Sequence, residues 1–350
     1  MRLVLVARAA CVLVASLMTA SLASGSPASG QTVEKAKVVI AVSGPPAQIY
    51  FLPVVLAKML GYFDQAGVNV ELQHFNAGSK ALESVLGGSA DFVAGAYENT
   101  VRMQAKGQNM QSVVIFGRYP QNVLGISKEQ AANYKSPADL KGKTIGITGP
   151  GSATQTFLNL ILANSGLQPS DVTTIAVGAG AVAVAAMKRS GELYAISNLD
   201  LAITELTMGG DIVVAVDSRT AEGTRAVYGG DYASGSLYAP SAFLGSNPNT
   251  VQAIANAMVR TLKWIATATP DEIVAKVPAD FYQHNQAVYR QALQNNLSSF
   301  SRDGLMPRDA PNNILKAMVK FDPNIARADI NMSATYDNRF VEKALQDTRP

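Results

Sequence analysis

Few side chains in this chain of 350 residues could do chemistry. It has two histidines, His74 and His284, and one cysteine, Cys11, and these stand far apart in the sequence. A metal site or a pair of nucleophile and base draws on several such residues brought close together, and the sequence offers no Gly-x-Ser-x-Gly elbow. We therefore expect no metal, no cofactor and no catalytic residue, which favours a binding protein over an enzyme.

The loop Gly149–Thr154 indicates a different chemistry, the holding of an anion by backbone N–H groups. An apolar run, Thr144–Thr148, enters this Gly-Pro-Gly loop, and Thr154–Ser165 then carries apolar residues at helical spacing. The first turn of such a helix has N–H groups without intrahelical partners, and Ser152 and Thr154 add hydroxyls. The loop lacks the third glycine of a dinucleotide fingerprint and the Gly-Lys-Ser/Thr of a phosphate loop. It predicts a cradle for one end of a small ligand, with an ordinary strand–helix turn as the alternative.

The elements around this loop follow a pattern that occurs twice in the chain. Each unit reads strand, helix, strand, helix, strand, and a glycine turn precedes the second helix in the later unit. Two such units predict an α/β protein with two lobes, each a βαβαβ-based sheet flanked by helices, whose strand-end loops face one cleft. The predicted strands are residues 37–43, 68–74 and 91–95 in the first unit, and 144–148, 172–177 and 193–197 in the second.

Two crossings between the lobes are expected where one unit gives way to the other. The first lies at Gly117–Pro120, between the apolar strands 111–116 and 123–127, and the return lies at 236–244. The first lobe is therefore predicted to comprise residues 36–120 plus 237–350, and the second lobe 121–236. Helices expected at 248–265, 283–295, 311–320 and 338–346 would brace the first lobe.

Residues 1–28 have the character of a secretory signal and its lead-in. Arg2 and Arg8 precede an apolar run and then small residues, which predicts export with cleavage between Ala23 and Gln31. Cleavage removes Cys11 and the two arginines, so that 29 basic residues become 27 against 26 acidic ones. This balance, with no basic run, argues against a nucleic-acid partner.

The run 56–95 resembles the periplasmic binding proteins of the nitrate, taurine, alkanesulfonate and pyrimidine-precursor import systems. It contains the pattern Ala57-Lys58-x-x-Gly61-x-Phe63, then a strand, then a helix followed by Gly88-x-x-Asp91-Phe92. The segments 139–143 and 149–154 are similar to the second lobe of that family, and the resemblance extends over about 38–243. Near 192–200 the chain departs from the family, because the usual Asp of the strand and a Glu-Pro turn are missing.

The resemblance implies a two-lobed, type II-like periplasmic binding protein that captures a small organic molecule by lobe closure. Its partners would be the ligand and the membrane permease of an ABC importer, and we expect a periplasmic monomer. A ligand with a sulfonate or carboxylate is favoured. Two alternatives stay open: a pyrimidine-precursor-type binding protein or synthase on the same fold, and a sensor that docks on a receptor. A synthase of this kind needs a cysteine-rich motif, which the mature chain lacks.

Candidate ligand contacts come from the loops at the strand ends of both predicted lobes. Arg118 is the cation expected near the anionic end of the ligand, where it could instead pair with Glu98, and Tyr97 and Tyr119 could flank an apolar body. The full predicted set is Ser43, Gln48, Gly78, Ser79, Tyr97, Glu98, Arg118, Tyr119, Ser152, Ala153, Thr154, Gly180, Asn198 and Asp200.

Overall fold

A computed structural model describes residues 32–189, 191–282 and 285–347, and from Val33 onward the chain forms one compact unit. The expected signal segment and Cys11 lie outside the described residues. Within the described part, no helix combines the length and the apolar character needed to cross a membrane.

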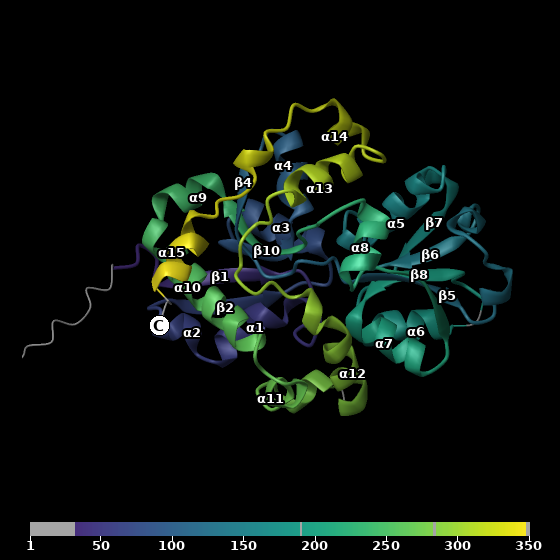
Figure 1. Cartoon of the computed structure of the whole chain (residues 1–350), viewed down its shortest axis with the longest axis horizontal. Coiled ribbons are helices and arrows are strands. Elements are labelled where there is room, and N and C mark those ends of the chain that lie inside the picture. Colours follow the sequence, from purple (N-terminus) through teal and green to yellow (C-terminus); the bar gives the residue numbers. More distant parts are fainter. Residues whose placement is uncertain (1–31, 190, 283–284, 348–350) are drawn as a thin grey trace, which may run out of the picture. The chain divides into compact units, whose positions relative to one another are not determined.

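Two five-stranded mixed sheets form the framework of this unit (Figure 1). The strand order is β2-β1-β3-β10-β4 in the first sheet and β7-β6-β8-β5-β9 in the second. The first sheet comprises β1 (Lys37–Val42), β2 (Asn69–His74), β3 (Phe92–Ala96), β4 (Met110–Ile115) and β10 (Gly235–Pro240). The second comprises β5 (Asn122–Ser127), β6 (Thr144–Ile147), β7 (Thr173–Ala176), β8 (Ala195–Leu199) and β9 (Ile212–Asp217).

The two sheets share one topology. Strand β1 pairs in parallel with β2 and β3, and β6 pairs in parallel with β7 and β8. In each sheet the fourth strand runs antiparallel to both neighbours, β10 between β3 and β4, and β5 between β8 and β9. The chain therefore crosses from one sheet to the other after β4 and returns before β10. This arrangement confirms the predicted two-lobed α/β fold, and the first and second lobes are named here after their sheets.

Helices flank both sheets, and those that connect the strands begin soon after a strand has ended. Up to residue 228 they are α1 (Leu52–Met59), α2 (Tyr62–Gln65), α3 (Gly78–Leu86), α4 (Glu98–Ala105), α5 (Ala153–Asn164), α6 (Ala181–Lys188), α7 (Asp200–Met208) and α8 (Ala221–Tyr228). They continue with α9 (Ser241–Ser246), α10 (Pro248–Ile265), α11 (Pro270–Val274), α12 (Gln286–Asn296), α13 (Ala310–Met318), α14 (Pro323–Arg327) and α15 (Arg339–Asp347). The sequence did not predict α7 and α8, because α7 follows β8 without a loop and α8 has a glycine inside it.

The apolar stripes of the helices pack where their spacing predicts. Phe157, Leu160 and Ile161 of α5 are buried against the second sheet. Helix α10 buries Ile254 and Met258 in the core of the first lobe and packs against α1, α2 and α15. These two helices anchor the cores that position the loops between the sheets.

The sequence predicts that the C-terminal helices all brace the first lobe, and for α13 this prediction is wrong. Helix α15 braces that lobe, because it packs on α10 and β4. Helix α13 instead packs against α5 and α8, where Ile314 and Met318 join the cluster that contains Phe157. Helix spacing alone specifies an apolar face, and the partner of that face is decided by the chain path.

Candidate functional site

The loop between β6 and α5 has the form that the sequence predicts. Ser152 is the N-cap of α5, and its hydroxyl accepts the N–H of Gln155 at 3.4 Å. The side chain of Gln155 in turn accepts the N–H of Gly151 at 2.6 Å. Gly151 has φ 74°, a left-handed conformation that glycine adopts without strain. The turn therefore delivers the chain directly into the first turn of the helix.

Hydroxyl groups hold this loop in place. Thr154 Oγ1 accepts the N–H of Thr148 at 3.0 Å and lies 2.8 Å and 2.9 Å from the hydroxyls of Thr148 and Ser152. Ser197 of β8 donates its hydroxyl to the carbonyl of Thr154 at 2.8 Å. The N–H groups of Ala153 and Thr154, in the first turn, have no partner within the helix. The loop is thus ordered by its own hydroxyls and by Ser197 of β8, whereas these two N–H donors have no partner within the helix.

A second helix N-terminus approaches from the first lobe. Helix α3 begins at Gly78, and Ala77 before it is extended and provides no side-chain cap. A Cβ atom on Gly149 would lie 3.1 Å from the Cβ of Ala77, so the loops of the two lobes are in close contact. Both helices have at least eight residues, and each N-terminus carries partial positive charge.

A small inner cavity with a free volume of about 30 Å³ lies between these two N-termini. Among the described residues, no charged side chain lines it, and the polar side chains Ser43 and Gln48 have atoms without a partner there, Oγ and Oε1. Gln48 is 4% exposed, and a buried polar atom without a hydrogen bond is costly. The lining of the inner cavity is Ser43, Gln48, Tyr50, Phe51, Asn76, Gly78, Ala96, Asn99, Thr148, Ser152, Ala153, Thr154, Ala179 and Leu199.

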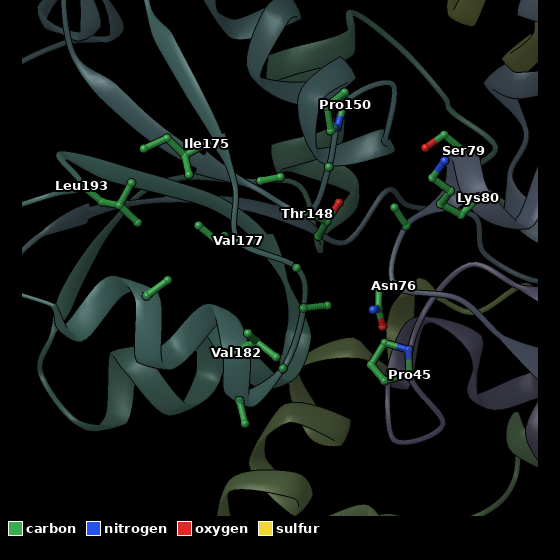
Figure 2. A pocket seen from close by; sticks show the side chains of 18 of the residues that line it. Pro45, Asn76, Ser79, Lys80, Thr148, Pro150, Ile175, Val177, Val182 and Leu193 are labelled. Carbon is green, nitrogen blue, oxygen red and sulfur yellow. The ribbon is translucent and has the colours of Figure 1, made fainter.

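A larger outer pocket of about 640 Å³ adjoins the inner cavity (Figure 2). The two share Asn76, Thr148 and Ala179 in their linings. Figure 2 shows Pro45, Asn76, Ser79 and Lys80 of the first lobe on one side, and Ile175, Val177, Val182 and Leu193 of the second lobe on the other. The outer pocket also has charged side chains in its lining, Lys80, Arg189 and Glu192.

The predicted contact residues divide into three groups. Six of them line the inner cavity: Ser43, Gln48, Gly78, Ser152, Ala153 and Thr154. Two line the outer pocket: Ser79 and Gly180. The remaining six are in neither lining: Tyr97, Glu98, Arg118, Tyr119, Asn198 and Asp200.

Asp200 binds the other lobe instead of lining the cavity. Its carboxylate accepts the N–H of Tyr50 at 2.9 Å and the N–H of Leu201 at 2.6 Å, and it is 1% exposed. Burial raises the pKa of Asp200 to about 6, against the lowering effect of these backbone bonds and of Arg219. The neighbouring Asn198 donates to the carbonyl of Gly178 at 2.9 Å and so orders the turn before α6.

Tyr97 and Glu98 lie in the protein interior. The hydroxyl of Tyr97 is bonded to the hydroxyl of Thr335, and the tyrosine is fully buried. Glu98 is 2% exposed and accepts the hydroxyl of Tyr232 at 3.3 Å. Burial raises the pKa of Glu98, whereas Arg102 opposes this shift. The hydroxyl of Tyr97 is thus bonded by a residue distant in sequence, and the ring lies in neither of the two linings.

Arg118 is engaged away from both cavities. Its Nε donates to the carbonyl of Ser298 at 2.9 Å, and its guanidinium lies 5.0 Å from the ring centroid of Tyr119. Glu98 does not pair with Arg118. The cation whose charge lowers the pKa of Glu98 is Arg102. Since no charged side chain is among the described lining residues of the inner cavity, the partial positive charge beside it is that of the two helix N-termini.

Several residues of the inner cavity were not in the predicted set. Those with a polar group are Tyr50, Asn76, Asn99 and Thr148, and Asn99 donates its amide to the hydroxyl of Tyr238 at 3.0 Å. Thr148 directly follows β6 and Asn76 lies two residues beyond the end of β2, so their place near a strand end was a usable signal. Within the described chain, no cluster of three or more His, Cys, Asp or Glu could hold a metal ion.

Comparisons with known proteins agree on one fold. The family model described as NMT1/THI5 like matches residues 48–273. A solved structure from Bordetella bronchiseptica RB50 is 45% identical, covers 91% of this chain and 99% of its own, and has a TM-score of 0.86. No curated protein matches the chain.

More distant structures show the fold alone. The alkanesulfonate-binding protein SsuA from Xanthomonas axonopodis pv. citri, bound to MOPS, is 19% identical with a TM-score of 0.64, and covers 89% of this chain and 99% of its own. The periplasmic nitrate-binding protein NrtA from Synechocystis PCC 6803 is 13% identical with a TM-score of 0.69, and the match covers 91% of this chain and 90% of NrtA. The desulfurization enzyme DSZB is 16% identical with a TM-score of 0.58, and the match covers 89% of this chain and 100% of DSZB.

Proposed function

Since the chain belongs to the NMT1/THI5-like family, we propose that it is the exported solute-binding component of an ABC importer. It captures a small organic anion, a sulfonate or a carboxylate, between its two lobes in the periplasm. Two structural relatives, SsuA and NrtA, are named as binding proteins for alkanesulfonate and nitrate, which supports a binding role for this fold.

The inner cavity is the observation that carries the proposal. It brings together the unpartnered polar atoms of Ser43 and Gln48 with the N-termini of α3 and α5. Free N–H groups and helix dipoles stabilise an anion, and each dipole contributes about 0.3–1 kcal/mol or more when partly buried. A carboxylate side chain in the lining would repel such a group, and the described lining has none. An anionic head group therefore suits this cavity better than a cation.

Lobe closure is the mechanism that follows from the topology. The chain passes between the sheets at residues 116–121 and 218–234, and the lining of the inner cavity comes from both lobes. A ligand that contacts both lobes stabilises the closed state, which is the state that would dock on the permease. We propose a monomer as the binding unit.

A binding protein fits the inner cavity better than an enzyme does. The enzyme DSZB shares the fold, so the fold itself does not separate the two classes. General acid–base or nucleophilic catalysis needs a titratable or nucleophilic side chain within reach of the substrate. The described lining of the inner cavity offers only hydroxyl, amide and apolar side chains, with no histidine or carboxylate as their base.

Deletion of one backbone donor tests the anion site directly. Ala153 is the first residue of α5, a position where proline is tolerated. Ser152 before it has φ −78° and ψ 165°, an extended conformation that a residue preceding proline favours. Ala153→Pro therefore removes the N–H and keeps the helix. A hydrogen bond to a charged group contributes about 1.5–3 kcal/mol, so affinity for the bound anion should fall about 10-fold to 150-fold.

Ala153→Val is the matched control, because it adds similar bulk and keeps the N–H. Titration calorimetry with methanesulfonate, acetate and nitrate, and with acetamide as a neutral counterpart, should show binding of an organic anion by the parent and loss in the proline variant. Small-angle scattering should show a smaller radius of gyration on binding. Equal affinity of the proline and valine variants, or preference for acetamide, would contradict the anion site. Turnover of a bound compound would favour the enzyme.

A further inference from the structure

A third cavity, with a free volume of about 550 Å³, lies between helices α4 and α14, which pack against each other (Figure 1). This volume is within the range of pockets that hold small molecules. The lining of this α4–α14 pocket includes one apolar residue and four charged ones: Ile325, Arg102, Lys106, Asp322 and Arg327. None of its described lining residues belongs to the inner cavity or to the outer pocket. The α4–α14 pocket is therefore a separate site, which the proposed function does not use.

The guanidinium of Arg102 has spare hydrogen-bond donors at this pocket. Its Nη2 donates to Thr156 Oγ1 at 2.6 Å, and its Nε lies 3.8 Å from the carboxylate of Asp322, which is too far for a hydrogen bond. Its Nη1 is buried and has no partner among the described residues. A guanidinium has five N–H donors, and a buried donor without a partner is costly. Arg102 therefore lacks an acceptor for Nη1.

Cations outnumber carboxylates in the lining of the pocket. Lys106 and Arg327 are exposed, and neither forms an ion pair with a described residue. Asp322 is the N-cap of α14, and its carboxylate accepts two backbone N–H groups there at 3.1 Å and 3.5 Å. The lining thus combines three cations with one carboxylate that already has partners.

Charges outside the lining offset this excess only in part. Glu98 acts on Arg102 from one turn earlier in α4, but it lies in the protein interior, and burial raises its pKa. The C-terminus of α4 adds about half a negative charge. Even when Glu98 is ionised, the three cations exceed these groups, and the pocket keeps a positive charge.

We propose that the α4–α14 pocket binds a phosphate group, either as free phosphate or as a small phosphate monoester. Arg102, whose side chain is 18% exposed, donates from the inner wall, and the exposed Lys106 and Arg327 supply charge at the opening. A planar guanidinium matches the oxygens of phosphate, and two negative charges match two cations that have no ion-pair partner. This site goes beyond the proposed function and does not depend on it. Since Arg102 of the first lobe also holds Thr156 of the second lobe, the anion lies one side chain away from a contact between the lobes.

Titration of inorganic phosphate into the mature chain tests the site without knowledge of the transported ligand. Calorimetry at an ionic strength held constant with chloride should show saturable binding with a dissociation constant below about 1 mM. Glycerol 3-phosphate should bind as well. The variant Ala153→Pro, which lacks a donor at the inner cavity, should bind phosphate at the α4–α14 pocket as tightly as the parent.

Charge-removing variants locate the bound phosphate. The double variant Lys106→Gln and Arg327→Gln should raise the dissociation constant about 4-fold to 25-fold, because each exposed charge contributes about twofold to fivefold. Arg102→Lys keeps the charge and loses the planar fork, so it should raise the constant about tenfold. The matched control is the double variant Lys276→Gln and Arg302→Gln, which removes the same charge from exposed positions outside the described linings. It should change the constant by no more than about twofold.

Three outcomes would overturn the inference. The first is the absence of saturable phosphate binding up to about 10 mM, and the second is an equal loss in the two double variants. The third is a phosphate site that Ala153→Pro abolishes and the Lys106 and Arg327 variant leaves intact, which would place the anion in the inner cavity. Sedimentation with phosphatidylglycerol vesicles distinguishes the source of the phosphate group, since binding to vesicles alone would indicate a membrane surface and contradict a site for a small anion. Failure of the chain to bind any organic anion would contradict the proposed function and leave this site standing.

Discussion

Asp200 makes the stability of this protein depend on pH in an unusual direction. Its carboxylate links the lobes through the N–H of Tyr50, and burial raises its pKa from 3.8 to about 6. A carboxyl group whose pKa is higher in the folded state binds more protons there than in the unfolded chain. The free energy of unfolding that it contributes therefore falls as the pH rises from about 4 to about 6, and recovers in acid.

The magnitude follows from the size of the pKa shift. The rise from 3.8 to about 6 is about two pKa units, and each unit corresponds to about 1.4 kcal/mol. Ionised Asp200 thus lowers stability by about 3 kcal/mol at neutral pH relative to its protonated form. Asp200→Asn removes the charge and keeps an oxygen that accepts one N–H. The variant also loses the second backbone hydrogen bond and the attraction to Arg219, which changes its free energy of unfolding by a constant amount. The change of the free energy of unfolding between acid and neutral pH comes from the charge of Asp200.

Denaturant unfolding of both proteins between about pH 4 and pH 7.5 measures this slope. The difference in free energy of unfolding, variant minus parent, should increase by up to about 3 kcal/mol toward neutral pH. Asp231→Asn is the control, because Asp231 is 60% exposed and pairs with Arg225 at 3.6 Å on the surface. Parallel pH profiles of the parent and Asp200→Asn would refute the reasoning, since Asp200 would then titrate equally in the folded and unfolded chains.

Three further predictions concern stability and binding. Phe157→Ala, in the fully buried core of the second lobe, should lower the free energy of unfolding by about 3–5 kcal/mol in denaturant titrations. Gln121, between β4 and β5, has φ 60°, so a β-branched valine there should cost about 1–3 kcal/mol more than asparagine, which tolerates this conformation. Thermal denaturation of the two variants compares them, and equal stability would show that the left-handed conformation is not required. Arg118→Ala should change ligand affinity by no more than about twofold in calorimetry, because its side chain is held by Ser298 and Tyr119. A loss of tenfold or more would place Arg118 at the ligand.

The sequence by itself determined the local elements and their repetition. The apolar run, glycine turn and helical spacing at 144–165 specify a strand, a loop and a helix N-terminus through interactions within one segment. Because the same order of elements occurs twice, two α/β lobes and a cleft at the strand ends could be predicted as well. Ser43 directly follows β1, Ser152 caps the helix that follows β6 and Thr154 lies in its first turn, and the structure brings all three into one inner cavity.

Only the tertiary structure decided which polar side chains face that cavity. Tyr97, Arg118 and Asp200 also stand near strand ends, but each is bonded by a segment distant in the chain. Thr335 bonds Tyr97, the carbonyl of Ser298 accepts from Arg118, and the N–H of Tyr50 donates to Asp200. These partners lie between 150 and 238 residues away, and local spacing carries no information about such contacts. A buried polar group must find a partner, and the folded chain path supplies it.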